Sequence, residues 1–375
     1  MPWLREQVGS VADQNEITVL ILESLTHYLR PKYWGLWLKS RSGPKYPPGR
    51  SGARIISCNY LRPPRRMLER SVSFPLLLRA VRRALRNEDL ASYDLIHAHF
   101  SSPSGTIARI LSRESGKPYV VTEHSSRFDL TFEQGVDVPE VLVDAKRIIC
   151  VSPGIKHSIE SVAGSELLNL SIIPNPIDTS EFKPSVSAET HTGPLRLLFV
   201  GHLLPRKGVD VLLSALGRIT NEGTDAELVV IGTGLEMDRL RKQAASLGLD
   251  SRVHFLGARP HEEMASYYSE SDVVVLSSYA ESFGVVVVEA LASGKPVVAT
   301  RSGGPEHIID DTVGVLVETG DSDGLADAIL NVADRLDTFV PEKLAGFVRN
   351  RYSMKSVGGQ ISTVYSETIA RTGGR

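Results

Sequence analysis

The sequence has few cysteines and no long apolar run. Its 375 residues include only two cysteines, Cys58 and Cys150, each beside the apolar residues of a predicted strand. Two cysteines exclude a disulfide framework and a cysteine-based zinc cluster, so we expect a protein of a reducing compartment. No apolar stretch approaches the ~18 residues that span a bilayer, and the first residues contain no hydrophobic signal segment. We therefore expect a cytoplasmic protein, neither secreted by a classical signal nor integral to a membrane.

Acidic residues are scarce in one part of the chain, although the net charge of the whole is only −2. Residues 28–86 contain 15 Lys or Arg and a single acid, Glu69. Such a segment is either an ordinary solvated surface or a contact for anionic lipid headgroups or a phosphorylated acceptor. Residues 74–86 favour the second interpretation, because arginines and apolar residues are interleaved there as in a basic amphipathic helix. No helix-turn-helix, zinc or aromatic-platform motif accompanies the charge, so nucleic acid is not an expected partner.

Short apolar runs and helical patterns alternate along the chain. The runs are rich in Val and Ile and predict buried parallel strands at 17–22, 95–98, 119–122, 147–151, 195–200, 227–231, 253–256, 273–276 and 297–300. This alternation predicts an α/β protein with doubly wound parallel sheets. A polar stretch after Asp178 is typical of an interdomain linker. We therefore predict domains at 1–178 and 179–345, and a helical tail, 346–375, that packs back on the first domain.

The loop after the predicted strand 273–276 combines glycine with two carboxylates. Gly284 lets the backbone approach a ligand closely, and the amides from Phe283 to Val285 would be unpaired donors at a helix start, as in an anion site. Glu289 lies about five residues into that helix, roughly 7.5 Å along its axis, where it would reach ribose hydroxyls beyond a diphosphate, with Glu281 at the mouth. On spacing alone, the simpler interpretation is a helix-capping Glu281 and a surface Glu289.

Three more glycine-containing loops follow predicted strands. One is Gly303-Gly304-Pro305-Glu306, in which paired glycines and a helix-starting proline suit close backbone approach. Another, at 199–208, ends with Arg206, Lys207 and Gly208 and offers cations to a diphosphate. Gly232 belongs to the third, at 232–234, which lacks the third glycine of a dinucleotide fingerprint. Each loop alone would be an ordinary turn.

Taken together, these residues resemble the retaining glycosyltransferases of family 4, which have the GT-B architecture of two Rossmann-like domains facing across a cleft. The resemblance covers nearly the whole chain and rests on four elements: the two glutamates with seven residues between them, the 303–306 turn, the 201–208 loop and the linker 174–178. It implies that Lys207 binds the donor diphosphate and Glu289 the ribose. It also implies that Glu281, with the backbone of Phe283, Gly284 and Val285, holds the donor sugar and phosphate, and that His124 is the cleft histidine that contacts this sugar.

The chain departs from the family's pattern at two places. His202 stands where the family usually has arginine, and we expect Arg206 to supply that charge; with Gly232, these residues complete the expected donor loops. The chain also begins inside the family's first helix, so we expect the domain 1–178 to lack the usual first strand and its glycine-rich loop. His97 and His99 share one face of a strand, yet no third ligand accompanies them, so we expect a structural role rather than a metal site.

The resemblance implies sugar transfer from a nucleoside diphosphate sugar to an acceptor hydroxyl, with retention at the anomeric carbon. His124, Glu281 and Lys207 are the expected catalytic residues, and neither a metal nor another cofactor is required. The basic segment 28–86 favours a lipid-linked or surface-polymer acceptor and a peripheral position at the inner face of a membrane. The alternatives are a nucleotide-sugar epimerase of the same fold and a truncated, non-catalytic nucleotide-sugar-binding protein.

Overall fold

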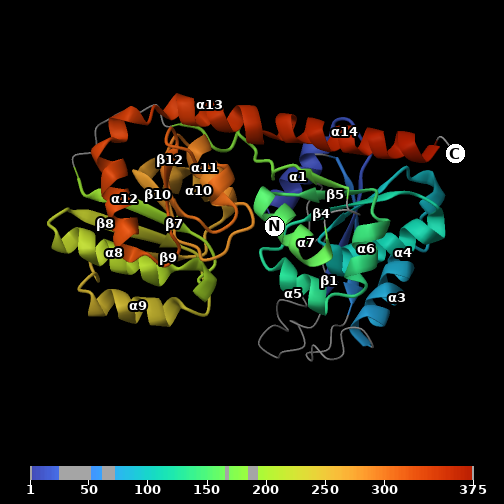
Figure 1. The fold of residues 1–375 in the computed structure, drawn as a ribbon, viewed down its shortest axis with the longest axis horizontal. Coiled ribbons are helices and arrows are strands. Elements are labelled where there is room, and N and C mark those ends of the chain that lie inside the picture. Colours follow the sequence, from blue (N-terminus) through green and yellow to red (C-terminus); the bar gives the residue numbers. More distant parts are fainter. Residues whose placement is uncertain (1, 25–51, 61–71, 165–168, 185–192, 374–375) are drawn as a thin grey trace.

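The computed structural model describes residues 2–24, 52–60, 72–164, 169–184 and 193–373. These residues form two lobes, each with helices packed around parallel strands, and the last two helices run along one side of both lobes (Figure 1). The predicted α/β architecture with parallel sheets is therefore confirmed.

The first lobe contains two separate ladders. β1 (Thr18–Ser24) pairs with β2 (Arg54–Tyr60), and a four-stranded sheet joins β3 (Ile96–His99), β4 (Tyr119–Glu123), β5 (Arg147–Cys150) and β6 (Leu170–Ile172) in chain order. Within the described residues, no ladder joins β1 to β3. Every residue of β4 is buried, which explains its unbroken apolar run. The helices of this lobe are α1 (Pro2–Ala12), α3 (Phe74–Ala84), α4 (Thr106–Ser115), α5 (Phe128–Gln134), α6 (Val138–Asp144) and α7 (Pro153–Ala163).

The second lobe contains a six-stranded sheet in the order β12-β11-β10-β7-β8-β9. Its strands are β7 (Leu195–Val200), β8 (Ala226–Ile231), β9 (Val253–Gly257), β10 (Val273–Leu276), β11 (Val297–Thr300) and β12 (Gly314–Val317). The helices around it are α8 (Val209–Asn221), α9 (Met237–Ser246), α10 (Met264–Glu270), α11 (Val285–Ala292), α12 (Ser322–Asp334) and α13 (Pro341–Tyr352). The bounds of β7, β10 and β11 agree with the predicted runs, because these central strands are buried on both faces or nearly so.

The chain crosses between the lobes twice, and the two crossings lie side by side. The first follows β6, where the Ile177 amide donates to the Tyr352 carbonyl oxygen at 2.9 Å and Ile177 forms a bridge with Ser353. The second is at Ser353 itself, between α13 and α14 (Met354–Gly373). The tail then packs on the first lobe, where Val357 and Ile361 share an apolar cluster with residues of α1, β4 and β5 (Figure 1).

Candidate active site at the junction of the lobes

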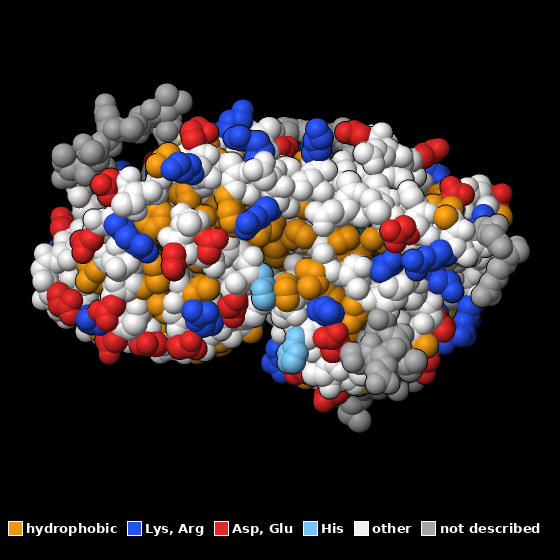
Figure 2. Space-filling model, turned by 45° about the horizontal axis from the view of Figure 1, so that its top comes forward, with side chains coloured by type: hydrophobic (Ala, Val, Ile, Leu, Met, Phe, Trp, Pro, Cys, Tyr) orange, Lys and Arg blue, Asp and Glu red, His pale blue; other side chains and the backbone are white. Residues whose placement is uncertain are grey.

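In the sheet of the second lobe, the order in which the chain adds strands reverses between β7 and β10. From β7 the chain adds β8 and β9 on one side, and it then returns to add β10, β11 and β12 on the other. In open α/β sheets, ligands bind at the carboxyl ends of the strands at such a reversal, because the two loops diverge and leave a crevice. The loops at this reversal are 201–208 and 277–284, which hold most of the predicted donor residues. In the space-filling view, the surface is indented between the two lobes (Figure 2).

Lys207 and Glu281 meet at this point. Lys207 ends a short 3-10 turn, Pro205–Lys207, and its ammonium group is ion-paired with the Glu281 carboxylate. The two side chains are only 12% and 14% exposed. Glu281 is thus bound to a cation instead of capping the following helix, so the simpler interpretation of this residue is wrong. The pair places one positive and one negative group at the mouth of the crevice.

The Lys207 turn lies directly against the loop after β10 because residue 208 is glycine. Gly208 has a φ of +60°, and a Cβ atom there would lie 2.1 Å from the Ser277 carbonyl oxygen. The Ser277 hydroxyl also donates to the Lys207 carbonyl oxygen at 3.1 Å. No other residue type fits both the left-handed backbone and this approach.

His202, Arg206 and Gly232 lie in the loops that follow the carboxyl ends of β7 and β8. The side chains of His202 and Arg206 are exposed, and the Arg206 guanidinium donates to the Ala280 carbonyl oxygen at 3.3 Å. Gly232 has a φ of +138°, and a Cβ atom there would lie 1.8 Å from the Gly201 carbonyl oxygen. The loop after β8 therefore packs on the loop after β7.

The predicted helix start after Gly284 is present as α11. Gly284 occupies the N-cap with a φ of 95°, and no side chain caps this helix. Phe283 is buried, with its ring at 5.8 Å from the Tyr352 ring in an edge-to-face arrangement. The backbone from Phe283 to Val285 therefore presents helix-start amides that no side chain occupies, and such amides attract anions.

Glu289 lies in the interior of the second lobe. It is 6% exposed, and its Oε2 accepts a hydrogen bond from the Tyr268 hydroxyl at 2.6 Å. Burial raises the pKa of the Glu289 carboxyl to about 7, and the bond from Tyr268 opposes this increase. The interpretation of Glu289 as a surface residue is therefore wrong. A carboxylate buried with so little compensation is costly, and such costs are typical of functional sites.

Three histidines of the first lobe stand in a row along β3 and the end of β4. The ring of His99 stacks on those of His97 and His124, at 4.6 and 5.4 Å, and His99 Nδ1 lies 3.1 Å from His124 Nε2. Both ring nitrogens of His97 are hydrogen-bonded, to Tyr365 Oη and Thr122 Oγ1, which fits the expected structural role. Burial lowers the pKa of His99 to about 4 and holds that of His124 well below its usual range, so both rings are neutral near pH 7.

Glu123 lies beside this row of histidines, and the sequence alone gave it no role. It is fully buried and accepts four hydrogen bonds: two from the amide and hydroxyl of Ser101, and two from the amides of His124 and Ser125. These bonds fix the backbone on both sides of the row and hence the position of His124. The one signal in the sequence is an acid at the end of an otherwise apolar buried strand. Tyr268, the partner of Glu289, carries no such signal.

No described helix is both long and apolar enough to cross a membrane. The predicted basic helix is present as α3, but its apolar residues Leu77 and Val81 are buried against β2 and α4. The exposed face instead presents Arg79, Arg82 and Arg83. Contact with an anionic surface would therefore involve these arginines and not the apolar stripe. Residues 28–51 and 61–71 of the basic segment lie outside the described residues.

Comparison with known proteins agrees with this geometry. Residues 36–181 match the family described as "Glycosyltransferase Family 4", and residues 183–336 match "Glycosyl transferases group 1". The chain is 31% identical over 310 residues to a D-inositol 3-phosphate glycosyltransferase of Corynebacterium kroppenstedtii, which covers 75% of this chain and 68% of the relative. It is 29% identical over 339 residues to a phosphatidylinositol N-acetylglucosaminyltransferase subunit of Arabidopsis thaliana, covering 88% and 73%.

Solved structures share the fold over nearly the whole chain. Sucrose-phosphate synthase from Thermosynechococcus elongatus superposes with a TM-score of 0.81 at 23% identity, covering 98% of this chain and 93% of that one. HepE of Anabaena, solved in complex with UDP-glucose, superposes with a TM-score of 0.72 at 21% identity, covering 98% and 96%. This likeness confirms the predicted GT-B arrangement of two lobes. The chain therefore belongs to glycosyltransferase family 4 and is a retaining enzyme that transfers a sugar from a nucleoside diphosphate sugar.

Proposed function

We propose that this enzyme transfers a hexose from a uridine diphosphate sugar to a hydroxyl of a phosphate-bearing, lipid-linked acceptor at the cytoplasmic face of a membrane. The observation that carries the donor part is the pairing of Lys207 with Glu281 beside the start of α11. The choice of uridine is supported by HepE, which was solved with UDP-glucose. The choice of acceptor is supported by relatives named for inositol phosphate and phosphatidylinositol.

In this proposal the second lobe holds the donor. The diphosphate lies between the Lys207 ammonium group and the amides of Phe283 to Val285, with Arg206 at the rim. Tyr268 occupies one oxygen of Glu289, so the other accepts hydrogen bonds from the ribose hydroxyls. Glu281, bound to Lys207, accepts hydrogen bonds from the sugar hydroxyls.

Transfer occurs on one face of the sugar. The bond between the anomeric carbon and the phosphate oxygen breaks, and its electron pair leaves with the nucleoside diphosphate. The acceptor oxygen bonds to the same face of the carbon, and its proton passes to the departing phosphate. Lys207, Arg206 and the helix-start amides stabilise the developing negative charge, so the step needs no metal. His124, neutral near pH 7, hydrogen-bonds the sugar without adding charge.

Calorimetric titration with UDP tests the donor site. We expect Lys207→Ala to weaken UDP binding at least tenfold, because it removes a charge-assisted contact made by a largely buried ammonium group. Arg252→Ala is the matched control, because Arg252 pairs with Asp225 at the amino ends of the strands of the same sheet, whereas Lys207 lies beyond the carboxyl ends. Equal UDP affinity for Lys207→Ala and the parent would disprove this site.

Incubation with radiolabelled UDP-sugars and a membrane extract tests the reaction. Label recovered in the lipid fraction supports the proposed acceptor, and label in free water-soluble glycosides would contradict it. An isomerised donor would indicate the epimerase alternative, which the family assignment disfavours. A chain that binds donor but neither transfers nor hydrolyses it would be the non-catalytic protein.

Vesicle sedimentation tests the membrane contact. We expect binding to vesicles with anionic lipid to exceed binding to neutral vesicles, and to fall when Arg79, Arg82 and Arg83 are replaced by alanine. Their guanidinium groups lie on the exposed face of α3, and each basic residue near an anionic surface is worth about 1 kcal/mol. Equal binding to both kinds of vesicle would refute the membrane position.

A further inference from the structure

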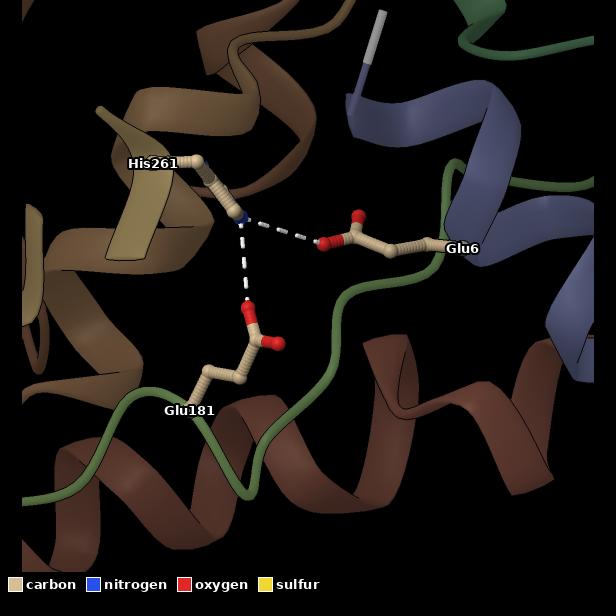
Figure 3. Close-up of side chains that lie close together, drawn as sticks. All are labelled: Glu6, Glu181 and His261. Carbon is tan, nitrogen blue, oxygen red and sulfur yellow. Dashed lines mark ion pairs between the residues drawn. The ribbon is translucent and has the colours of Figure 1, made fainter. Parts of the chain in front are cut away.

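Three side chains from distant parts of the sequence converge at the junction of the lobes. Glu6 comes from α1 of the first lobe, Glu181 from the segment that connects the lobes, and His261 from the 3-10 turn His261–Glu263 of the second lobe. Figure 3 shows both carboxylates pointing at the same nitrogen of the His261 ring. Their ligand atoms all lie within 4.8 Å of one another.

The two separations in this cluster are longer than those of charge-assisted hydrogen bonds. His261 Nε2 lies 3.7 Å from Glu6 Oε1 and 3.4 Å from Glu181 Oε2. Charge-assisted N–H···O bonds are about 2.7–2.9 Å long. Within the described residues, His261 Nε2 and the second oxygen of Glu6 are buried and have no hydrogen-bond partner. Glu6 is only 7% exposed, and the charge partner that the described residues offer it is the His261 ring at 3.7 Å, which compensates the carboxylate only when the ring is protonated. A metal ion at the same point would compensate both carboxylates with the ring neutral.

These same distances suit a shared metal ion. Zinc binds histidine nitrogen and carboxylate oxygen at about 2.0–2.2 Å in a tetrahedron. Two ligand atoms of such a tetrahedron lie roughly 3.3–3.6 Å apart, which is close to the two separations measured here. A ring nitrogen and two carboxylates are ligands that zinc accepts, and water can complete the fourth position.

We propose that Glu6, Glu181 and His261 bind a zinc ion that fastens the two lobes to each other. Each ligand comes from a different part of the molecule, so the ion joins α1, the connecting segment and the second lobe at one point (Figure 3). The ring of Phe182 packs edge-on against His261 at 5.6 Å and restricts its orientation. The zinc is structural and takes no part in sugar transfer, so this proposal does not depend on the proposed donor and acceptor.

Zinc titration of chelator-treated, dialysed full-length protein tests the site. We expect one equivalent of Zn²⁺ to bind by calorimetry and elemental analysis, with an increase in melting temperature. His261→Ala and Glu6→Gln should each weaken binding at least tenfold and abolish the increase in melting temperature. Glu6→Gln nearly preserves the shape of the side chain, and circular dichroism without metal verifies that both variants fold.

A second histidine–glutamate pair supplies the matched control. His254 Nε2 lies 3.6 Å from Glu227 Oε2, but this pair is more exposed and, among the described residues, has no third ligand. We therefore expect His254→Ala to bind zinc as the parent does. Binding below one equivalent, binding that survives both His261→Ala and Glu6→Gln, or an equal loss in His254→Ala would overturn the proposal. Zinc titration of Lys207→Ala, which disables the proposed donor site and leaves the three ligands in place, separates failure of this proposal from failure of the donor site.

Discussion

Replacing Glu289 with glutamine should make the protein more stable in alkaline solution while weakening donor binding. Burial raises the folded-state pKa of Glu289 from 4.5 to about 7. The folded state therefore holds the proton of the Glu289 carboxyl more tightly than the unfolded state does. The protonated carboxyl contributes stability that is fully present below pH 4.5. That stability is lost as the pH rises through about 7. At about 1.4 kcal/mol per pKa unit, the loss amounts to roughly 3 kcal/mol.

Glutamine carries no proton to lose, and its side-chain carbonyl can still accept the Tyr268 bond. The free energy of unfolding of Glu289→Gln should therefore match that of the parent near pH 4.5 and exceed it by up to ~3 kcal/mol at pH 8. Urea unfolding followed by far-ultraviolet circular dichroism between pH 4.5 and 8.5 measures both values. In the same variant, UDP affinity at pH 8 should fall, because ribose hydroxyls donate more strongly to a carboxylate than to an amide.

A difference in stability that does not grow with pH would refute this reasoning. It would mean that Glu289 is not forced toward its neutral form by burial. Tyr268→Phe provides a check in the opposite direction. Loss of the hydroxyl removes the bond that stabilises the charged carboxylate, so this variant should be less stable than the parent, and by more at pH 8 than at pH 5.

Three further changes have distinct expected outcomes. Gly208→Ala should destabilise the protein by more than about 2 kcal/mol in urea unfolding and abolish UDP binding. Gly116→Ala, where φ is +74° and no atom lies within 4 Å of the added Cβ, should cost about 1 kcal/mol and leave UDP binding unchanged. Glu123→Gln should lower kcat more than it raises KM for the donor, because an amide cannot accept all four hydrogen bonds that fix the His124 loop; an unchanged kcat would contradict that role. Burial raises the thiol pKa of Cys58 to about 11 and of Cys150 to about 12, so neither should react with a thiol reagent within minutes at pH 8, and both should react in urea.

Strands with simple patterns could be predicted from the sequence, and strands with mixed patterns could not. β7, β10 and β11 lie in the middle of a sheet and consist of continuous apolar runs. β2 was expected beside Cys58 but was given no bounds, because its exposed and half-buried residues surround a single buried residue, Cys58, within the most basic part of the chain. β12 is only four residues long, begins with glycine and lies at the edge of its sheet, so its pattern resembles that of a turn.

The sequence named the residues of the candidate site, but it did not reveal their partners. Gly208 and Gly284 mark loops whose backbones adopt positive φ values, and this requirement is visible as glycine in the sequence. The Lys207–Glu281 ion pair joins positions 74 residues apart, and only the reversal of the sheet brings them together. The burial of Glu289 was also not foreseeable, because it depends on Tyr268 from a separate helix.

The lobes are joined by two adjacent connections, at Ile177 and at Ser353. A single connection would let one lobe twist freely about the other, whereas two parallel connections joined by a hydrogen bond resist twisting and still permit bending. We therefore expect the two connections together to limit rotation of one lobe relative to the other.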